Sequence, residues 1–152
     1  MDEDKIELIC KPEVEKIIGC AFHVYNKLGH GFLEELYQRA LEITFNREDI
    51  PFVRKKNLPI YFDGTLIADH YQADVICYDK VILELKAVSA ISDEHVKQLI
   101  NYLKATGIQA GLVINFGNPR KLEWKKVVFT NTKYLRNNNI PTTTNKSDEI
   151  KP

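Results

Sequence analysis

At 152 residues, with 44% hydrophobic and 28% charged side chains, the chain has the size and composition of one soluble globular domain. Its 21 basic and 21 acidic residues cancel, which excludes a uniformly basic nucleic-acid-binding surface and leaves only a local patch for such a partner. The three cysteines are too widely spaced for a disulfide framework or a zinc pattern. No apolar run is long enough to predict a membrane span or a secretory signal, so we expect a protein of the reducing cytoplasm.

Two amphipathic helices are predicted at the start of the chain. Pro12 suits a first helical position, apolar residues then recur at helical spacing to Leu28, and Gly29 stops the helix. A second helix is predicted from about Phe32 to Asn46. Its expected apolar face consists of Leu33, Leu36, Tyr37, Ala40, Leu41, Thr44 and Phe45.

Two adjacent carboxylates begin this second helix. At 100° per residue, Glu34 falls at the edge of the apolar face and Glu35 falls on the back. Glu34 can therefore turn toward the core, while Glu35 is expected to be a solvated charge. A negative charge in a first helical turn is also favoured by the helix dipole, so a structural role explains Glu34 as well as a functional one.

A polar connection with a basic run, Arg54-Lys55-Lys56, is expected between residues 48 and 57. Such a run is usually a solvated loop, although it could contact a phosphate backbone. Residues 58–62 and 65–69 then flank Asp63-Gly64, which predicts a two-residue hairpin turn. Pro59 indicates that the first of these strands lies at a sheet edge.

The segment Asp74–Lys86 predicts the central hairpin of the fold, with its turn at residues 78–80. The second strand is apolar on both faces and is expected to be buried, yet Glu84 and Lys86 point to one side of it. In this register Asp74 lies opposite Glu84. Two like charges this close require a positive partner, which is either a divalent cation or neighbouring bases such as Lys86.

A third helix is predicted from the N-cap Ser92 to about Thr106. Beside its apolar stripe, His95, Gln98 and Tyr102 share a second face. A wet amphipathic surface explains this face, but a polar stripe packed beside a charged strand is also a candidate wall for a site.

Two further strands are expected at residues 108–116 and 121–130. Trp124 lies among bases in the second of them, and a role as a core anchor is favoured over stacking on a nucleobase. From residue 137 the chain is polar and is expected to be disordered. We therefore expect one domain over residues 1–136 and a tail over residues 137–152.

Three motifs in this order resemble a known superfamily. Asp74, Glu84 and Lys86 resemble the D…(D/E)-x-K signature of the restriction-endonuclease-like, or PD-(D/E)xK, nucleases. Gln98 and Tyr102 match the Q-x-x-x-Y helix motif of one large branch of it. The stretch 31–37, G-F-L-E-E-L-Y, matches G-x-x-E-x-x-Y and is similar to the small bacterial family called GxxExxY proteins.

The resemblance spans about residues 10–130 and includes the segments 84–88 and 112–116. The sequence departs from the pattern at three places. Ala73 stands where the superfamily has proline, the turn 29–31 reads G-H-G in place of G-P-G, and Tyr25 stands where a histidine is expected. None of these departures removes a candidate metal-binding carboxylate.

The resemblance implies an α/β (α+β) restriction-endonuclease-like fold with a mixed central sheet flanked by helices. It implies that Asp74, Glu84 and the carbonyl of Leu85 bind Mg²⁺ or Mn²⁺, with Glu34 contributing directly or through water. Lys86 would stabilise developing charge or position the nucleophile, and Gln98 and Tyr102 would line the site. The implied substrate is nucleic acid, DNA more than RNA, cut by a metal-activated water.

Two interpretations stay open at this stage. The first is a metal-dependent nuclease, which the intact set of Asp74, Glu84 and Lys86 favours. The second is a catalytically silent nuclease-like fold that serves as a binding or accessory module for nucleic acid or protein. A small-molecule enzyme is disfavoured, because no nucleotide-binding loop or nucleophile–base pair is evident. The sequence leaves open the type of strand that is cut and the choice between a monomer and a homodimer.

Overall fold

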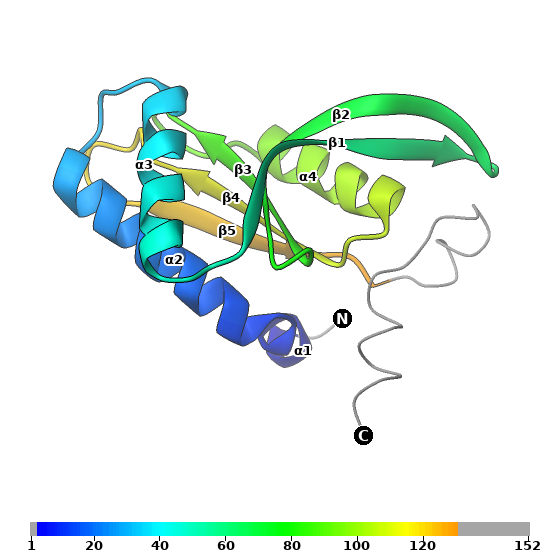
Figure 1. The fold of residues 1–152 in the computed structure, drawn as a ribbon, viewed down its shortest axis with the longest axis horizontal. Helices are drawn as coiled ribbons and strands as arrows, with labels where there is room; N and C mark the ends of the chain where they lie inside the picture. The colour runs from blue at the N-terminus through cyan, green and yellow to red at the C-terminus, as the bar shows by residue number, and fades with distance from the viewer. Residues whose placement is uncertain (1–2, 131–152) are drawn as a thin grey trace.

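The computed structural model describes residues 3–130, except for the side chains of Asp69 and His70. The predicted tail over residues 137–152 therefore lies outside the described residues. Within the described residues, the helices and strands form an α/β fold with a mixed sheet, as the sequence predicts (Figure 1). In chain order these are α1 (Glu3–Leu8), α2 (Lys11–Leu28), α3 (Glu34–Arg47), β1 (Phe52–Phe62), β2 (Thr65–Cys77), β3 (Val81–Lys86), α4 (Asp93–Thr106), β4 (Ala110–Asn115) and β5 (Glu123–Val128).

The sheet has five strands in the order β1-β2-β3-β4-β5. Neighbouring strands are antiparallel except β3 and β4, which are parallel and are connected by α4. This arrangement makes β3 the central strand, as its apolar run predicts. It also makes β1 an edge strand, which agrees with the position of Pro59.

Helices cover both faces of the sheet (Figure 1). On one face, α2 and α3 pack against alternate residues of the strands, including Val75, Leu83, Leu85 and Leu112. On the other face, α4 contributes Leu99 and Leu103 to a smaller cluster. Because side chains alternate along a strand, Glu84 and Lys86 fall on the α4 side together with Ile82.

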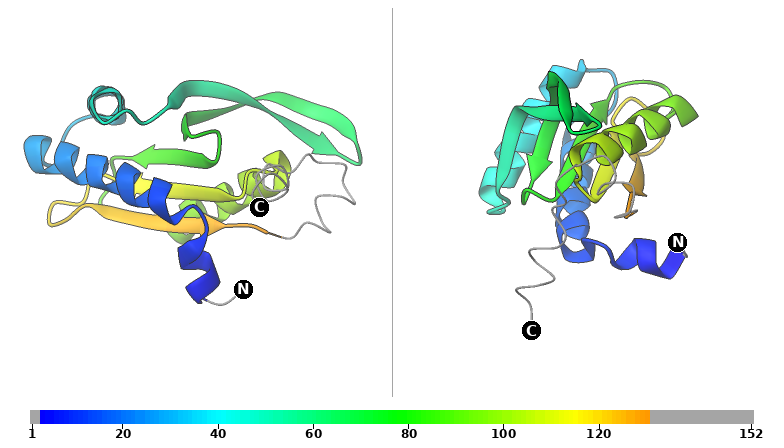
Figure 2. Two further views of the ribbon diagram at one scale, coloured as in Figure 1. Left: turned by 60° about the horizontal axis from the view of Figure 1, so that its bottom comes forward. Right: turned by 90° about the vertical axis from the view of Figure 1, so that its right-hand side faces the viewer.

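The hairpin of β1 and β2 is longer than predicted. β1 begins at Phe52, so the prediction of a polar connection over residues 48–57 is wrong. Asp63 and Gly64 both have positive φ, which is the backbone that a two-residue hairpin turn requires. The end of this hairpin projects past α4 as an arm (Figure 2). Phe62, Leu66 and Ile67 are exposed on it.

Three details of the helices and of β5 differ from the predictions. The short helix α1 was not expected. Leu33, which precedes α3, and Leu36 on α3 are exposed, whereas the polar residues Gln38 and Glu42 of α3 are buried. Trp124 is 41% exposed on β5, so its assignment as a core anchor is wrong. Among the described residues, no helix is long and apolar enough to cross a membrane.

One glycine is required by close packing of the backbone at the end of β4. A Cβ built on Gly117 would collide with the backbone of Ala87 and Val88, which immediately follow β3. Gly19, on α2, offers a matched comparison because a Cβ there would have no heavy atom nearby.

We expect Gly117→Ala to lower the free energy of unfolding by about 2–3 kcal/mol, because the backbone after β3 must shift. Gly19→Ala should instead raise it by about 0.5–1 kcal/mol, since alanine is the better helix former. Urea unfolding of both variants measures the difference. Equal effects of the two substitutions would show that the backbone contact of Gly117 is unimportant.

Candidate active site

The candidate site is built around the end of β3, in the middle of the sheet. Register between β2 and β3 pairs Val75 with Leu83, Ile76 with Ile82 and Cys77 with Val81, as the predicted hairpin requires. Glu84 and Lys86 follow on the α4 face and are both half-buried. The structure therefore brings two of the predicted site residues to one end of a rigid central strand.

Asp74 differs from the simple hairpin register, because no described strand pair includes it. Its carboxylate Oδ2 accepts a hydrogen bond from the backbone N–H of Leu85 at 2.8 Å. The side chain of Asp74 thus takes a place at the edge of β3, next to Glu84. This contact keeps Asp74 close to Glu84 although the two do not form a ladder pair.

The other side of Asp74 is also held by a side chain. The buried amide of Gln38 on α3 donates to the carbonyl oxygen of Asp74 at 3.0 Å and to Glu42 at 3.0 Å. On β1, the register of the neighbouring pairs would place Lys55 opposite Asp74, but these two residues do not pair and Lys55 has a φ of 47°. A non-glycine residue in this region distorts the strand, and such strain is found preferentially at functional sites. Because Gln38 of α3 bonds to the carbonyl of Asp74, α3 stabilises β2 at the residue that has no strand partner among the described residues.

The basic run of β1 is engaged by acids of α3. Arg54 lies 3.2 Å from Glu42 and 3.5 Å from Glu35, and Lys55 lies 3.5 Å from Glu35. The expectation that these bases form a solvated loop is therefore wrong. Glu35 is exposed, as expected for a solvated charge, and it forms these ion pairs at the surface.

The carboxylates are electrostatically coupled. Burial raises the pKa of Glu84 to about 7, and the charge of Asp74 adds to the rise, while the Tyr71 hydrogen bond and Lys86 oppose it. Burial likewise raises the pKa of Asp74, against the hydrogen bond from Leu85 and the charge of Lys86. Lys86 acts on both acids and Lys55 acts on Asp74, yet burial still makes both acids costly to ionise, so the site favours added positive charge.

The G-x-x-E-x-x-Y segment positions Glu34. Gly29 and Gly31 have φ of 68° and 110°, which only glycine adopts readily, and they turn the chain between α2 and α3. The buried Tyr37 donates to the carbonyl of Gly29 at 2.5 Å, accepts from Phe32 N–H at 3.2 Å and stacks on Phe116. Glu34 then accepts a hydrogen bond from the N–H of Ala87 at 3.3 Å, just beyond β3.

The second face of α4 contributes to a cleft. Gln98 donates to the hydroxyl of Tyr102 at 3.1 Å, and both residues line a cleft of about 440 Å³ with Glu84 and Lys86. His95 does not join them, because its ring accepts from the N–H of Ser92 in a capping box. The structure therefore gathers Gln98 and Tyr102 with the strand residues and assigns His95 a structural contact.

Sequence reasoning missed Tyr71 and Gln38. Tyr71 on β2 also lines the cleft and donates a hydrogen bond to Glu84. No motif marked it, although its position three residues before Asp74 could have drawn notice. Gln38 and Glu42 are separated by one helical turn, and this polar pair was the available signal for a buried contact on α3.

The donor set fits a hard divalent cation. Among residues 3–130, no group of three or more His, Cys, Asp or Glu side chains could hold a metal. Two carboxylates suffice for Mg²⁺, which is commonly bound through one or two carboxylates and keeps several waters. Glu34 accepts a hydrogen bond from Ala87 N–H and does not complete a group of three metal-binding side chains among the described residues.

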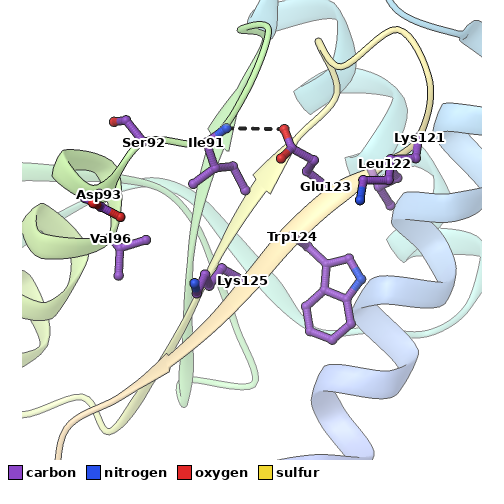
Figure 3. A pocket seen from close by; sticks show the side chains of 9 residues that line it. All are labelled: Ile91, Ser92, Asp93, Val96, Lys121, Leu122, Glu123, Trp124 and Lys125. Atoms are coloured by element: carbon purple, nitrogen blue, oxygen red, sulfur yellow. Dashed lines mark hydrogen bonds between the residues drawn. The ribbon is translucent and has the colours of Figure 1, made fainter.

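A second hollow lies between the start of α4 and β5 (Figure 3). It measures about 340 Å³, and Glu123 accepts a hydrogen bond from the N–H of Ile91 beside it. Its acids, Asp93 and Glu123, are mixed with lysines, and Trp124 points away from Asp93 (Figure 3). None of the predicted site residues lines this hollow, whereas Glu84, Lys86, Gln98 and Tyr102 all line the cleft beside β3.

The raised pKa of Glu84 predicts how stability depends on pH without metal. The folded state binds the proton more tightly than the unfolded chain, so the stability from this group is complete below about pH 4.5 and is lost as the pH rises through about 7. Glu84→Gln removes this loss. Relative to the parent, the variant should gain about 2 kcal/mol between pH 4 and pH 8.

Urea unfolding at several pH values in EDTA measures this gain. Glu15→Gln, on the exposed side of α2, controls for the loss of one surface charge. Parallel pH profiles for Glu84→Gln and the parent would refute the assignment.

A known protein superfamily is similar to the chain over most of its length. A model of the PD-(D/E)XK nuclease superfamily matches residues 11–127 of the 152-residue chain. A solved structure described as "Crystal structure of SSO0001" matches with a TM-score of 0.46 and 16% sequence identity. That match covers 68% of this chain and 54% of the other, so this chain spans about half the length of that one. No curated protein matches the sequence.

The superfamily match includes every residue that lines the cleft, from Ile60 on β1 to Tyr102 on α4, and also Glu34 and Asp74. It covers most of the chain and extends through all five strands except the last residue of β5. The chain belongs to the PD-(D/E)XK nuclease superfamily.

Proposed function

We propose that the protein is a metal-dependent nuclease that hydrolyses phosphodiester bonds of nucleic acid, with DNA preferred over RNA. One observation carries the proposal. The carboxylate of Asp74 bonds to β3 at Leu85, between Glu84 and Lys86 in the sequence of that strand. The charge of Lys86 acts on both carboxylates, which places the three groups in one electrostatic neighbourhood. A module that only binds nucleic acid has no need for two half-buried acids beside a phosphate.

In this proposal each residue has a separate task. Asp74, Glu84 and the carbonyl of Leu85 would hold Mg²⁺ or Mn²⁺, and Glu34 would contribute through water. When bound there, the cation would supply positive charge that polarises the phosphate and lowers the pKa of a water molecule. Lys86 stabilises the charge that develops on the phosphate oxygens. Attack of water on phosphorus breaks one ester bond, and the products are a phosphomonoester and a free hydroxyl end.

The walls of the cleft orient the strand that is cut. Gln98 and Tyr102 offer an amide and a phenol to the substrate backbone beside Lys86. The contacts of Glu34 and Tyr37 further support a placement of the chain in the GxxExxY branch of the superfamily, since each residue of the motif has a definite structural task.

Cleavage of single- and double-stranded DNA and RNA tests this proposal directly. We expect cleavage with Mg²⁺ or Mn²⁺ and none in EDTA. Lys86→Ala and Glu84→Ala should each lower the rate by about 100-fold or more, because they remove charge stabilisation and a metal ligand. Lys16→Ala, which removes the same charge from an exposed position of α2, should cleave like the parent. Cleavage that persists in EDTA would refute the mechanism.

Calorimetry of metal binding separates a nuclease from a silent fold. Asp74→Asn keeps an oxygen that can accept from Leu85 but loses the negative charge, so its affinity for Mn²⁺ should fall about tenfold or more. Equal affinity in the parent and the variant would remove Asp74 from the metal site. Metal binding by the parent without cleavage of any substrate would instead favour the accessory module.

A further inference from the structure

Tyr71 lines the cleft, lies outside the three motifs and donates a hydrogen bond to a proposed metal ligand. It comes from β2, where Leu58 of the edge strand is its partner. Its hydroxyl donates to Oε1 of Glu84, and its ring lies half-buried against the cleft wall. The other carboxylate oxygen of Glu84 is left for a different partner.

The ring of Tyr71 is fixed by a second aromatic residue. Its centroid lies 3.4 Å from that of Tyr102, and the two ring planes differ by 14°. Tyr102 in turn accepts the hydrogen bond of Gln98. A continuous set of contacts therefore runs from the polar face of α4 through two stacked rings to the carboxylate of Glu84.

These contacts restrict the orientation of the Glu84 side chain. Glu84 has three side-chain torsions, and the negative charge of Asp74 nearby favours its rotation away. A hydrogen bond from a rigid phenol holds one carboxylate oxygen in place. Partners of this kind orient metal-binding carboxylates in many sites, and their loss typically weakens metal binding by about 10–100-fold.

We propose that Tyr71 is a positioning residue that holds the Glu84 carboxylate in the orientation needed to bind the divalent cation. The stack on Tyr102 fixes Tyr71 and thereby connects the Gln98–Tyr102 face of α4 to the metal site. This inference rests on the proposed nuclease function and assigns no contact between Tyr71 and the substrate.

Tyr71→Phe tests the inference, because it removes the hydroxyl and keeps the ring. Calorimetry should show Mn²⁺ binding about tenfold weaker than in the parent. Tyr61→Phe, on β1 of the same hairpin and outside the cleft lining, should bind like the parent. In cleavage assays the Tyr71→Phe defect should appear as a higher requirement for Mn²⁺ and disappear at saturating metal, which a general loosening of the fold would not produce.

A second variant tests the inference if Tyr71→Phe does not fold. Tyr102→Leu leaves the hydroxyl of Tyr71 but removes the ring that fixes it, so Mn²⁺ affinity should fall by a smaller factor. Unchanged affinity in whichever of the two variants folds would overturn the positioning role.

The remaining outcomes are also decisive. Tighter binding by Tyr71→Phe would overturn the inference, since the hydroxyl would then compete with the cation for Glu84. If the parent binds Mn²⁺ and Tyr71→Phe binds it equally well, the positioning role is wrong and the nuclease proposal stands. If the parent binds neither Mn²⁺ nor Mg²⁺, both are wrong.

Discussion

The candidate site depends on one interruption of the sheet, at Asp74. A regular hairpin would pair the backbone of this residue with both neighbouring strands and direct its side chain to one face. Here the N–H of Leu85 bonds to the carboxylate of Asp74, and Gln38 bonds to its carbonyl. Side chains replace the backbone partners that are lost, so buried polar groups stay satisfied. The interruption places a carboxylate at the edge of the central strand.

Helix α3 stabilises the sheet at Asp74 from the face that lies opposite to α4. Its buried polar pair, Gln38 and Glu42, connects the carbonyl of Asp74 to Arg54 on β1. Its first residue, Glu34, reaches the backbone just after β3, and the turn before it is held by Tyr37. One helix thus fixes the strand that carries Asp74 and brings a third acid near the end of β3.

Helix α4 and the β1–β2 hairpin complete the cleft from the other side. The cleft is lined by amide and phenol groups, by the base Lys86 and by the acid Glu84, whose ionisation is opposed by burial. A formally neutral protein can therefore present a local site that attracts cations while its surface as a whole does not. The polar groups that line the cleft come from three elements, β2, β3 and α4.

The order and type of the main elements follow from the amino-acid sequence alone, because apolar periodicity, glycine turns and the Ser92 cap are local signals. The sequence also determines that Glu84 and Lys86 share a side of a buried strand, since alternation follows from backbone geometry. Three contacts could not be predicted without the packing of α3, β2 and β3. Gln38 bonds to Asp74 across 36 positions, Leu85 bonds to Asp74 across 11, and Tyr71 bonds to Glu84 across 13. Contacts at such separations depend on how the elements pack and not on any local propensity.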